Sequence, residues 1–487
     1  MKLSRLSAAI SGGVFALSGA SVFAETDLSA LQQQIQVLQQ QVAALQQPQR
    51  VATPNSTEAT DSPAEIDGST ISATQSDVDG VRSDLENYKY DQDRLRERST
   101  VKSARDATLF GTVQVRFQAQ DQNTASGNPA PNTTRRDTFD IPTALIGVRG
   151  NLFRDYNEGK NLDYQLSFTY AKRPTAAGAG SDLNLADAFV RHNFFSTNGG
   201  PEVARLNLTL GQQLIPFGLE AQAPEDLRPT IDVAQAPAQL GLFNRQVGAI
   251  VRGDIKPFVD YSANYRAPLF EYAVGVVNGN GSNKVDDNGS KDYLARAAFT
   301  LPVEYASWLR ELKFGVSYLK GTKNVTDKAG AKVLDGDGRK DRLGFDIYYN
   351  HAPYGATYEY IQGRTDFADA NDKIQEVKAE GHTLTLFYTI GDQFFNSIKS
   401  AAKFDDFWPK SIQPYYRYDL YNPNTGVDVV GIAGKDAGEI VKQSLGFNFF
   451  FAQTTKLQVA VNSVDYKTET ATIKDYNEVQ AQLQYTF

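Results

Sequence analysis

The carboxyl end of the chain carries the pattern that most constrains the fold. Apolar Val479, Ala481, Leu483, Tyr485 and Phe487 alternate strictly with polar Glu478, Gln480, Gln482, Gln484 and Thr486. A period of two predicts a β-strand, because successive side chains of a strand point to opposite faces. A strand of a soluble sandwich also alternates. However, a Gln-rich face opposite an apolar face that ends in aromatics is typical of a membrane barrel, with water inside and lipid outside.

The same alternation recurs over most of the chain. It is clear from Leu109 to Ala119, and further strands are predicted over residues 141–149, 162–170, 187–194, 205–210, 247–252, 269–277, 293–300, 312–318, 343–350, 354–362, 383–390, 412–421, 445–450, 457–462 and 476–487. The total of about sixteen is even, as expected for a bacterial barrel with both ends in the periplasm. We therefore predict an all-β protein, in which residues 108–487 form a transmembrane antiparallel β-barrel with an aqueous lumen.

The connections between the strands indicate the orientation of this barrel. Residues 120–137, 218–244, 321–341 and 422–438 are long and rich in Gly, Asn, Asp and Pro, so we expect them to connect strands at the external end. The second of these loops contains three prolines that forbid regular pairing and apolar residues such as Ile231, Leu240 and Leu242 that would be poorly solvated outside, so we predict that it folds into the lumen. Residues 352–353 and 452–455 are short and fall at periplasmic positions. The long segment 391–411 falls on the periplasmic side and does not fit the alternation.

The first 107 residues differ in character from the barrel. Residues 1–24 have the charged start, short apolar stretch and small terminal residues of a signal peptide. In residues 25–47 an apolar heptad seam of Leu28, Leu31, Ile35, Leu38, Val42 and Leu45 predicts a helical coiled coil. Its alternative is an amphipathic helix docked on its own domain. Residues 48–107 are predicted to be a linker with one short helix. Because the signal peptide implies export and both barrel ends are expected in the periplasm, we expect the N-terminal extension to lie there.

Composition and motifs argue against several classes of function. Cysteine is absent, and after the N-terminus no apolar run is long enough for a transmembrane helix. The net charge of −8 argues against nucleic acid as a partner. The three histidines are scattered, and Asp335-Gly336-Asp337-Gly338 precedes two basic residues, so we interpret it as a loop tip and not as a calcium site. We expect no enzyme, cofactor or metal, because no hydrolase or phosphate-binding motif occurs.

One stretch resembles a known family. Gly211-Gln212, followed by Pro216-Phe217-Gly218-Leu219-Glu220, is similar to a motif of the phosphate-selective porin O and P family of Gram-negative outer membranes. Further support comes from residues 187–190, residues 272–279 and the terminal Phe487. The resemblance implies a porin embedded in outer-membrane lipid, a homotrimer by family analogy, and an inward-folded constriction loop after the fifth strand.

The sequence departs from this family where phosphate would bind. The family often carries several arginines in the second strand, but here only Arg149 remains before Gly150. The expected constriction loop contains Glu225, Asp226, Arg228 and Asp232 and no lysine. Phosphate binding depends on convergent Arg and Lys donors, so phosphate selectivity does not carry over with the fold.

Strand parity predicts which side chains line the lumen. The polar faces of the strands carry Arg116, Arg149, Arg191, Arg252, Arg296 and Arg417, which could form a cationic track for anions. The alternative is that they pair with acids of the lumen, such as Asp187, Asp346, Glu359 and Asp419.

The leading interpretation is a porin for passive diffusion of small hydrophilic solutes, with anions such as phosphate among the candidates. The alternatives are a structural or adhesive protein tethered through its helical extension, and an outer-membrane hydrolase.

Overall fold

The computed structural model describes residues 79–90, 107–121, 136–155, 159–175, 178–261, 265–327, 330–394, 407–426, 434–469 and 474–487. The chain divides into two units, residues 1–78 and 79–487. The predicted signal peptide and coiled coil lie outside the described residues. Residues 79–90 form a helix. Among the described residues, the length and apolarity that a membrane-crossing helix needs are not found together in any helix.

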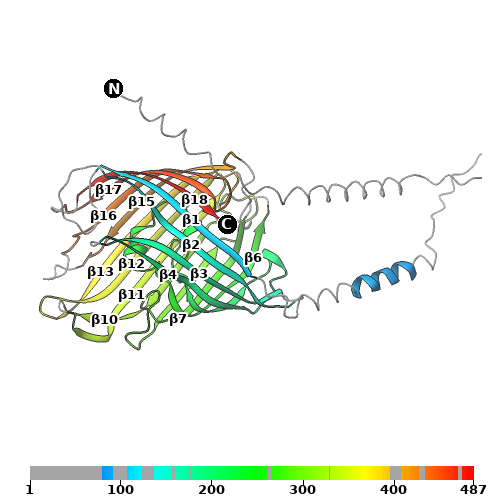
Figure 1. Ribbon diagram of the computed structural model, residues 1–487, viewed down its shortest axis with the longest axis horizontal. Coiled ribbons are helices and arrows are strands. Elements are labelled where there is room, and N and C mark those ends of the chain that lie inside the picture. Colours follow the sequence, from blue (N-terminus) through cyan, green and yellow to red (C-terminus); the bar gives the residue numbers. More distant parts are fainter. Residues whose placement is uncertain are drawn as a thin grey trace, which may run out of the picture. The chain divides into compact units, whose positions relative to one another are not determined.

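The rest of the described chain is a series of long strands (Figure 1). The first half contains β1 (Ala107–Gln120), β2 (Arg136–Asp155), β3 (Gly159–Thr175), β4 (Gly178–Asn193), β5 (Leu206–Gln213), β6 (Gln246–Asp260), β7 (Tyr265–Val277), β8 (Asp292–Thr300) and β9 (Lys313–Lys320). The second half contains β10 (Thr322–Thr326), β11 (Lys332–His351), β12 (Tyr354–Ala368), β13 (Ile374–Tyr388), β14 (Ile390–Gly391), β15 (Ser411–Asn422), β16 (Ile440–Phe450), β17 (Lys456–Tyr466) and β18 (Tyr476–Thr486). The short helical elements are η1 (Gly200–Glu202), η2 (Glu225–Leu227) and α3 (Gln235–Gln239).

These strands close into a ring. β1 pairs with β2 on one side and with β18 on the other, and Val113 lies opposite both Ala144 and Tyr485. β10 continues β9 and pairs with β11, while β14 continues β13 and pairs with β15. The eighteen segments therefore make sixteen positions in a closed antiparallel barrel. This confirms the predicted barrel and its strand number, and closure leaves no unpaired sheet edge in lipid.

Each predicted strand overlaps an observed one and extends beyond it by at most two residues, but one predicted loop is wrong. Residues 321–341 contain β10 and the first part of β11, which pair as a hairpin extending the barrel wall. Asp335-Gly336-Asp337-Gly338 therefore lies in a strand and not at a loop tip. The Gly- and Asp-rich composition suggested a loop, but cross-strand pairing outweighs this weak local preference.

The barrel is polar inside and apolar outside. In β18 the polar Glu478, Gln480, Gln482 and Gln484 are at most 3% exposed, whereas Val479, Leu483 and Tyr485 are 44–53% exposed. A water-soluble protein places most of its apolar side chains inside. The reversed arrangement is the one a barrel needs when lipid surrounds it and water fills it.

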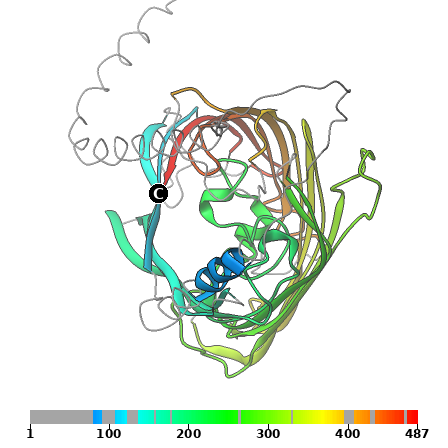
Figure 2. The ribbon, with the colours of Figure 1, turned by 90° about the vertical axis from the view of Figure 1, so that its right-hand side faces the viewer.

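A long connection occupies the interior of this barrel. Residues 214–245 join β5 to β6, and Figure 2 shows this green stretch, with α3, inside the ring of strands. Its apolar side chains, including Ile215, Phe217, Ala236 and Leu242, join wall residues in one buried cluster. Glycines in the wall allow the close approach, because Phe217 packs against Gly344 and Ala236 against Gly381 where a Cβ would clash.

Candidate functional site

We call residues 214–245 the lumen segment. It enters and leaves the barrel at the same end, since Gln213 at the end of β5 pairs with Gln246 at the start of β6. It therefore does not span the membrane. Pro216 cannot donate to a strand ladder, and Gly218 has a φ of +57° that favours glycine. These residues end β5 and turn the chain inward.

Three consecutive residues of the lumen segment are bound by three different strands. The amide of Gly218 donates to Ser317 Oγ of β9 at 3.1 Å, and the amide of Leu219 donates to Glu359 Oε1 of β12 at 3.0 Å. The carboxylate of Glu220 forms an ion pair with Arg417 of β15. The segment is thus fixed to the wall as soon as it enters the lumen.

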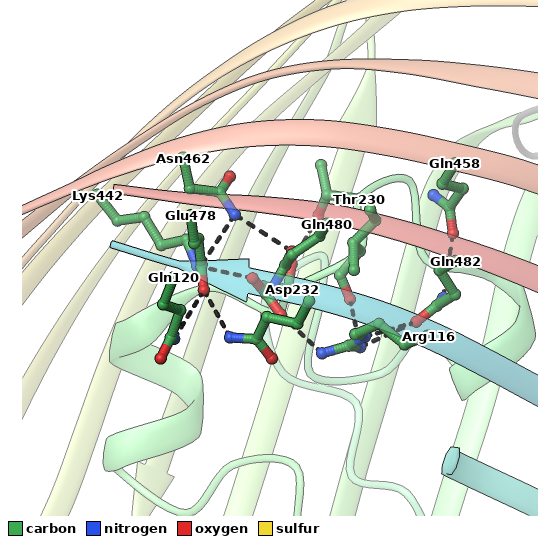
Figure 3. A network of polar contacts seen from close by, with 12 residues as sticks. Arg116, Gln120, Thr230, Asp232, Lys442, Gln458, Asn462, Glu478, Gln480 and Gln482 are labelled. Carbon is green, nitrogen blue, oxygen red and sulfur yellow. Dashed lines mark hydrogen bonds and ion pairs between the residues drawn. The ribbon is translucent and has the colours of Figure 1, made fainter. Parts of the chain in front are cut away.

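Asp232 is the charged centre of a second contact with the wall (Figure 3). Its carboxylate lies 3.2 Å from Arg116 Nη1 of β1 and 2.6 Å from Lys442 Nζ of β16. Lys442 also pairs with Glu478 of β18 at 2.8 Å. Burial alone raises the pKa of Asp232, but Lys442 and Arg116 outweigh it and lower the pKa to about 2. Asp232 is therefore ionised at neutral pH.

Glu225, the first residue of η2, is held in a similar way. Its carboxylate lies 2.9 Å from Arg245 Nη1, and Arg245 Nε donates to Asp187 of β4 at 2.8 Å. Burial again raises the pKa of Glu225, and Arg245 outweighs it and lowers the pKa to about 2. Arg245 thus ties the lumen segment to β4 at the point where β6 begins.

Asp226 and Arg228 contact the wall mainly through their backbones. The carbonyl of Asp226 accepts from Gln484 Nε2 at 2.8 Å, and the carbonyl of Arg228 accepts from Lys456 Nζ. The guanidinium of Arg228 lies over the Phe243 ring at 4.8 Å. Burial raises the pKa of the Asp226 carboxyl and lowers the pKa of the Arg228 guanidinium.

The six arginines predicted from strand parity do not form one continuous group. Four lie in ion pairs: Arg116 with Asp232, Arg191 with Asp163, Arg296 with Asp346, and Arg417 with Glu220. Arg252 donates to Gln213 and to the carbonyl of Leu214. Arg149 is exposed and lies over the Phe110 ring at 5.0 Å.

The four acids predicted to pair with these arginines make two kinds of contact, ion pairs and hydrogen bonds to backbone amides. Of the four, Asp346 pairs with one of the six arginines, Arg296, whereas Asp187 pairs with Arg245. Glu359 accepts from the amide of Leu219, and Asp419 accepts from the amide of Gln235 at 2.8 Å. Two of these acids therefore bind the backbone of the lumen segment.

Sequence reasoning missed three charged residues of this network. Arg245 follows directly after the expected end of the loop, and Lys442 precedes the predicted strand 445–450. Glu478 was assigned to the polar face but not to an ion pair. The alternation continues back through Ser444 and Lys442, so a longer window would have placed Lys442 on the lumen face.

A cavity of about 950 Å³ lies on one side of the lumen segment. Its lining includes Glu220 and Arg228 of the segment, Lys456, and wall residues near the connections after β4, β6, β11 and β16. These connections lie at the predicted periplasmic end, opposite the end at which the lumen segment enters. Glu311, in the connection from β8 to β9, also lines the cavity and has a φ of +81°.

Residues 112–331 match the family model described as phosphate-selective porin O and P, which confirms the resemblance over that range. No curated protein matches the sequence.

Three solved structures resemble this chain at low sequence identity. The Acinetobacter baumannii outer membrane channel DcaP is 11% identical, with a TM-score of 0.49 over 80% of this chain and 99% of that one. Salmonella typhi OmpF, in complex with daunomycin, is 12% identical, with a TM-score of 0.47 over 79% and 98%. Pseudomonas putida OprB is 12% identical, with a TM-score of 0.45 over 78% and 94%.

Proposed function

Because residues 112–331 match the phosphate-selective porin O and P family, we propose that the chain is an outer-membrane porin. It forms a water-filled channel for the passive diffusion of small hydrophilic solutes. The observation that carries this proposal is the reversed burial of the barrel, with buried Gln and Glu facing the lumen and exposed Val, Leu and Tyr facing outward. Lipid outside and water inside account for both faces.

We propose that the lumen segment is the constriction of this channel. It spans from β5 to contacts with β1, β15, β16 and β18, so a solute that passes the barrel must pass beside it. Among the predicted constriction residues, Glu225 and Asp232 are in ion pairs with wall or segment cations. Their role is to hold the segment, and the width that remains beside it limits flux.

The selectivity that we infer is a weak preference for anions. Four of the six predicted pore-lining arginines are neutralised by acids, so they offer little free charge to a solute. Arg149, Arg252, Arg228 and Lys456 have no ion pair with an acid among the described residues, and Arg228 and Lys456 line the cavity, so we infer that these residues contribute positive potential. Phosphate selectivity needs several convergent donors and is not part of this proposal.

We expect a homotrimer in the outer membrane, with the N-terminal extension in the periplasm. The trimer follows from family analogy, and the heptad seam of residues 28–45 offers a second contact between copies. Cross-linking of the protein in mild detergent would give a trimeric band. A monomer under the same conditions would contradict this assembly.

Conductance separates the porin from the two alternatives. Single-channel recording in a planar bilayer should give discrete steps of current. Reversal potentials measured across a salt gradient should show that anions permeate slightly better than cations. A structural or adhesive protein, or a hydrolase with a closed lumen, would give no steps. Absence of conductance from correctly folded barrels would contradict the proposal.

A further inference from the structure

The lumen segment is held at its entry by three side chains of the barrel wall, of which Arg417 was predicted to line the solute path. Gly218, Leu219 and Glu220 are consecutive, yet Ser317 of β9, Glu359 of β12 and Arg417 of β15 each bind one of them. We call Ser317, Glu359 and Arg417 the wall clasp. Each of the three is at most 3% exposed.

Ser317 connects the segment to a buried ion pair. Its hydroxyl oxygen accepts from the Gly218 amide at 3.1 Å and from Arg296 Nη1 at 2.8 Å. Arg296 Nη2 donates to Asp346 at 2.9 Å, which fixes the direction of the guanidinium. Arg296 therefore acts on the segment through Ser317 and is not available as a free charge.

Glu359 is the member of the wall clasp whose position is hardest to explain without the segment. One carboxylate oxygen accepts from the Leu219 amide, and the other is buried without a hydrogen-bond partner. A Cβ at Gly218 would lie 1.6 Å from the first oxygen, so only glycine fits at this position. A buried carboxylate is costly unless it binds something, and the described partner is the segment's backbone.

Arg417 contacts two parts of the lumen segment that are distant in sequence, Glu220 and Asp232. Its guanidinium pairs with Glu220 and donates to the carbonyl of Asp232 at 3.1 Å, while Nε donates to Thr385. The other oxygen of Glu220 accepts from the Ala234 amide at 2.8 Å. Residues 220 and 234 are thereby held together against β15.

We propose that Ser317, Glu359 and Arg417 are positioning residues that set where the constriction lies, and so set the width of the channel. This inference rests on the proposed function, because it gives the clasp a role in solute passage. Loss of one clasp contact frees the entry of the segment while the barrel wall stays closed. The segment then moves across the lumen, and the open channel becomes wider on average and noisier.

The test uses the full chain, which has no cysteine of its own. Ala223→Cys lies on the segment and lines the cavity, so a spin label there reports motion of the segment. The label is compared in the unaltered background and with Glu359→Ala, Glu359→Gln and Ser317→Ala. Glu271→Ala is the matched control, since Glu271 also lines the cavity but pairs with Lys313 at 3.0 Å.

We expect Glu359→Ala and Ser317→Ala to raise label mobility several-fold and to increase open-channel current noise. Glu359→Gln keeps an oxygen that can accept from the Leu219 amide, so it should restore the immobile label. Glu271→Ala should leave the label immobile. Unchanged mobility in Glu359→Ala, or an equal rise in Glu271→Ala, would overturn the wall clasp.

Folding is checked by the shift of unheated barrels on gels. If Glu359→Ala gives no folded barrel, Ser317→Ala decides, because it removes a single hydroxyl: an immobile label there overturns the proposal. The spin label does not depend on conduction. A protein that conducts no ions would contradict the porin proposal, while the label would still test the clasp.

Discussion

At the scale of single residues, the lumen is held together by buried charges that neutralise each other. Lys442 sits between Asp232 of the lumen segment and Glu478 of β18, and the side chains of Lys442 and Glu478 are 8% and 2% exposed. Glu478 also accepts from Gln118 and Asn462. Such a cluster is stable only while every member is paired, because an unpaired buried charge costs several kcal/mol.

Removing Lys442 should therefore destabilise the barrel. Lys442→Met leaves two carboxylates facing each other, and we expect a loss of about 3 kcal/mol in the free energy of unfolding, measured by urea titration in lipid. Lys467→Met is the control, because Lys467 pairs with Asp436 and Glu439 in exposed positions and should change stability little. Equal effects of the two substitutions would contradict the buried role of Lys442.

Glu311 should give the channel a pH response near its periplasmic mouth. Burial raises the pKa of Glu311 to about 8, and Asp260 adds to this while Arg310 opposes it. As pH rises through 8 the carboxyl ionises, so a negative charge appears at the cavity. An acid with a raised pKa is most compatible with the folded state while protonated, so its contribution to stability falls as pH rises from about 4.5 to 8.

We expect the anion preference to fall between pH 7 and 9, by roughly tens of per cent, because one charge acts over about 10 Å in salt. Reversal potentials at each pH measure this change. Glu311→Gln cannot ionise and should show a flat profile in the same range. The same change in both proteins would assign the response to another group.

Residue identity and strand parity were enough to assign Arg116, Arg296 and Arg417 to the polar face, but not to name their partners. Arg116 and Asp232 are 116 positions apart, and Lys442 and Asp232 are 210 apart. The pairs depend on how the lumen segment crosses the barrel. No periodicity in the sequence relates a loop residue to a wall residue, so these contacts require the structure.

At the scale of elements, the strands were well predicted because the face of each one is set by a period of two. Sixteen alternating stretches match sixteen wall positions, since lipid and water impose opposite demands on successive side chains. The limits of the strands were less predictable. The β10–β11 hairpin is rich in Gly, Asp and Lys, because it needs no apolar face where lipid does not cover it.

The lipid face can be tested at the centre of β1. Val113 is the seventh of fourteen residues in this strand and is 39% exposed. Val113→Arg should cost roughly 2–4 kcal/mol in the free energy of folding into lipid if this position lies near the midplane. Gln118→Arg, on the lumen face beside Glu478, should cost far less. A cost near zero for Val113→Arg would mean that the faces are assigned the wrong way round.

At the scale of the whole molecule, the barrel and the lumen segment depend on each other. The segment carries apolar side chains that the wall buries, and the wall carries Glu359, Arg417 and Lys442, each of which binds a backbone amide or a carboxylate of the segment. The inward fold was predictable from the sequence, because prolines forbid regular pairing and Ile231, Leu240 and Leu242 would be poorly solvated outside. The wall contacts that fix its depth were not.

Deleting residues 222–239 tests the segment as a constriction. The deletion removes α3 and the Asp232 contact but leaves the wall clasp and Arg245 in place. Conductance should rise several-fold, because the width of the narrowest point limits flux. The deletion also removes three acids, Glu225, Asp226 and Asp232, and one base, Arg228, so the net charge of the lumen rises by two. We therefore expect reversal potentials to shift toward anions.

The control is a shortened external turn. Removing residues 370–372, between β12 and β13, changes the length of a connection without touching the lumen segment, and conductance should stay as it was. Folding of both variants is checked by the gel shift of unheated barrels. If the 222–239 deletion folds and its conductance is unchanged, the segment does not limit flux. The narrowest point must then lie elsewhere, and the wall clasp would lose its link to solute passage even if it still orders the segment.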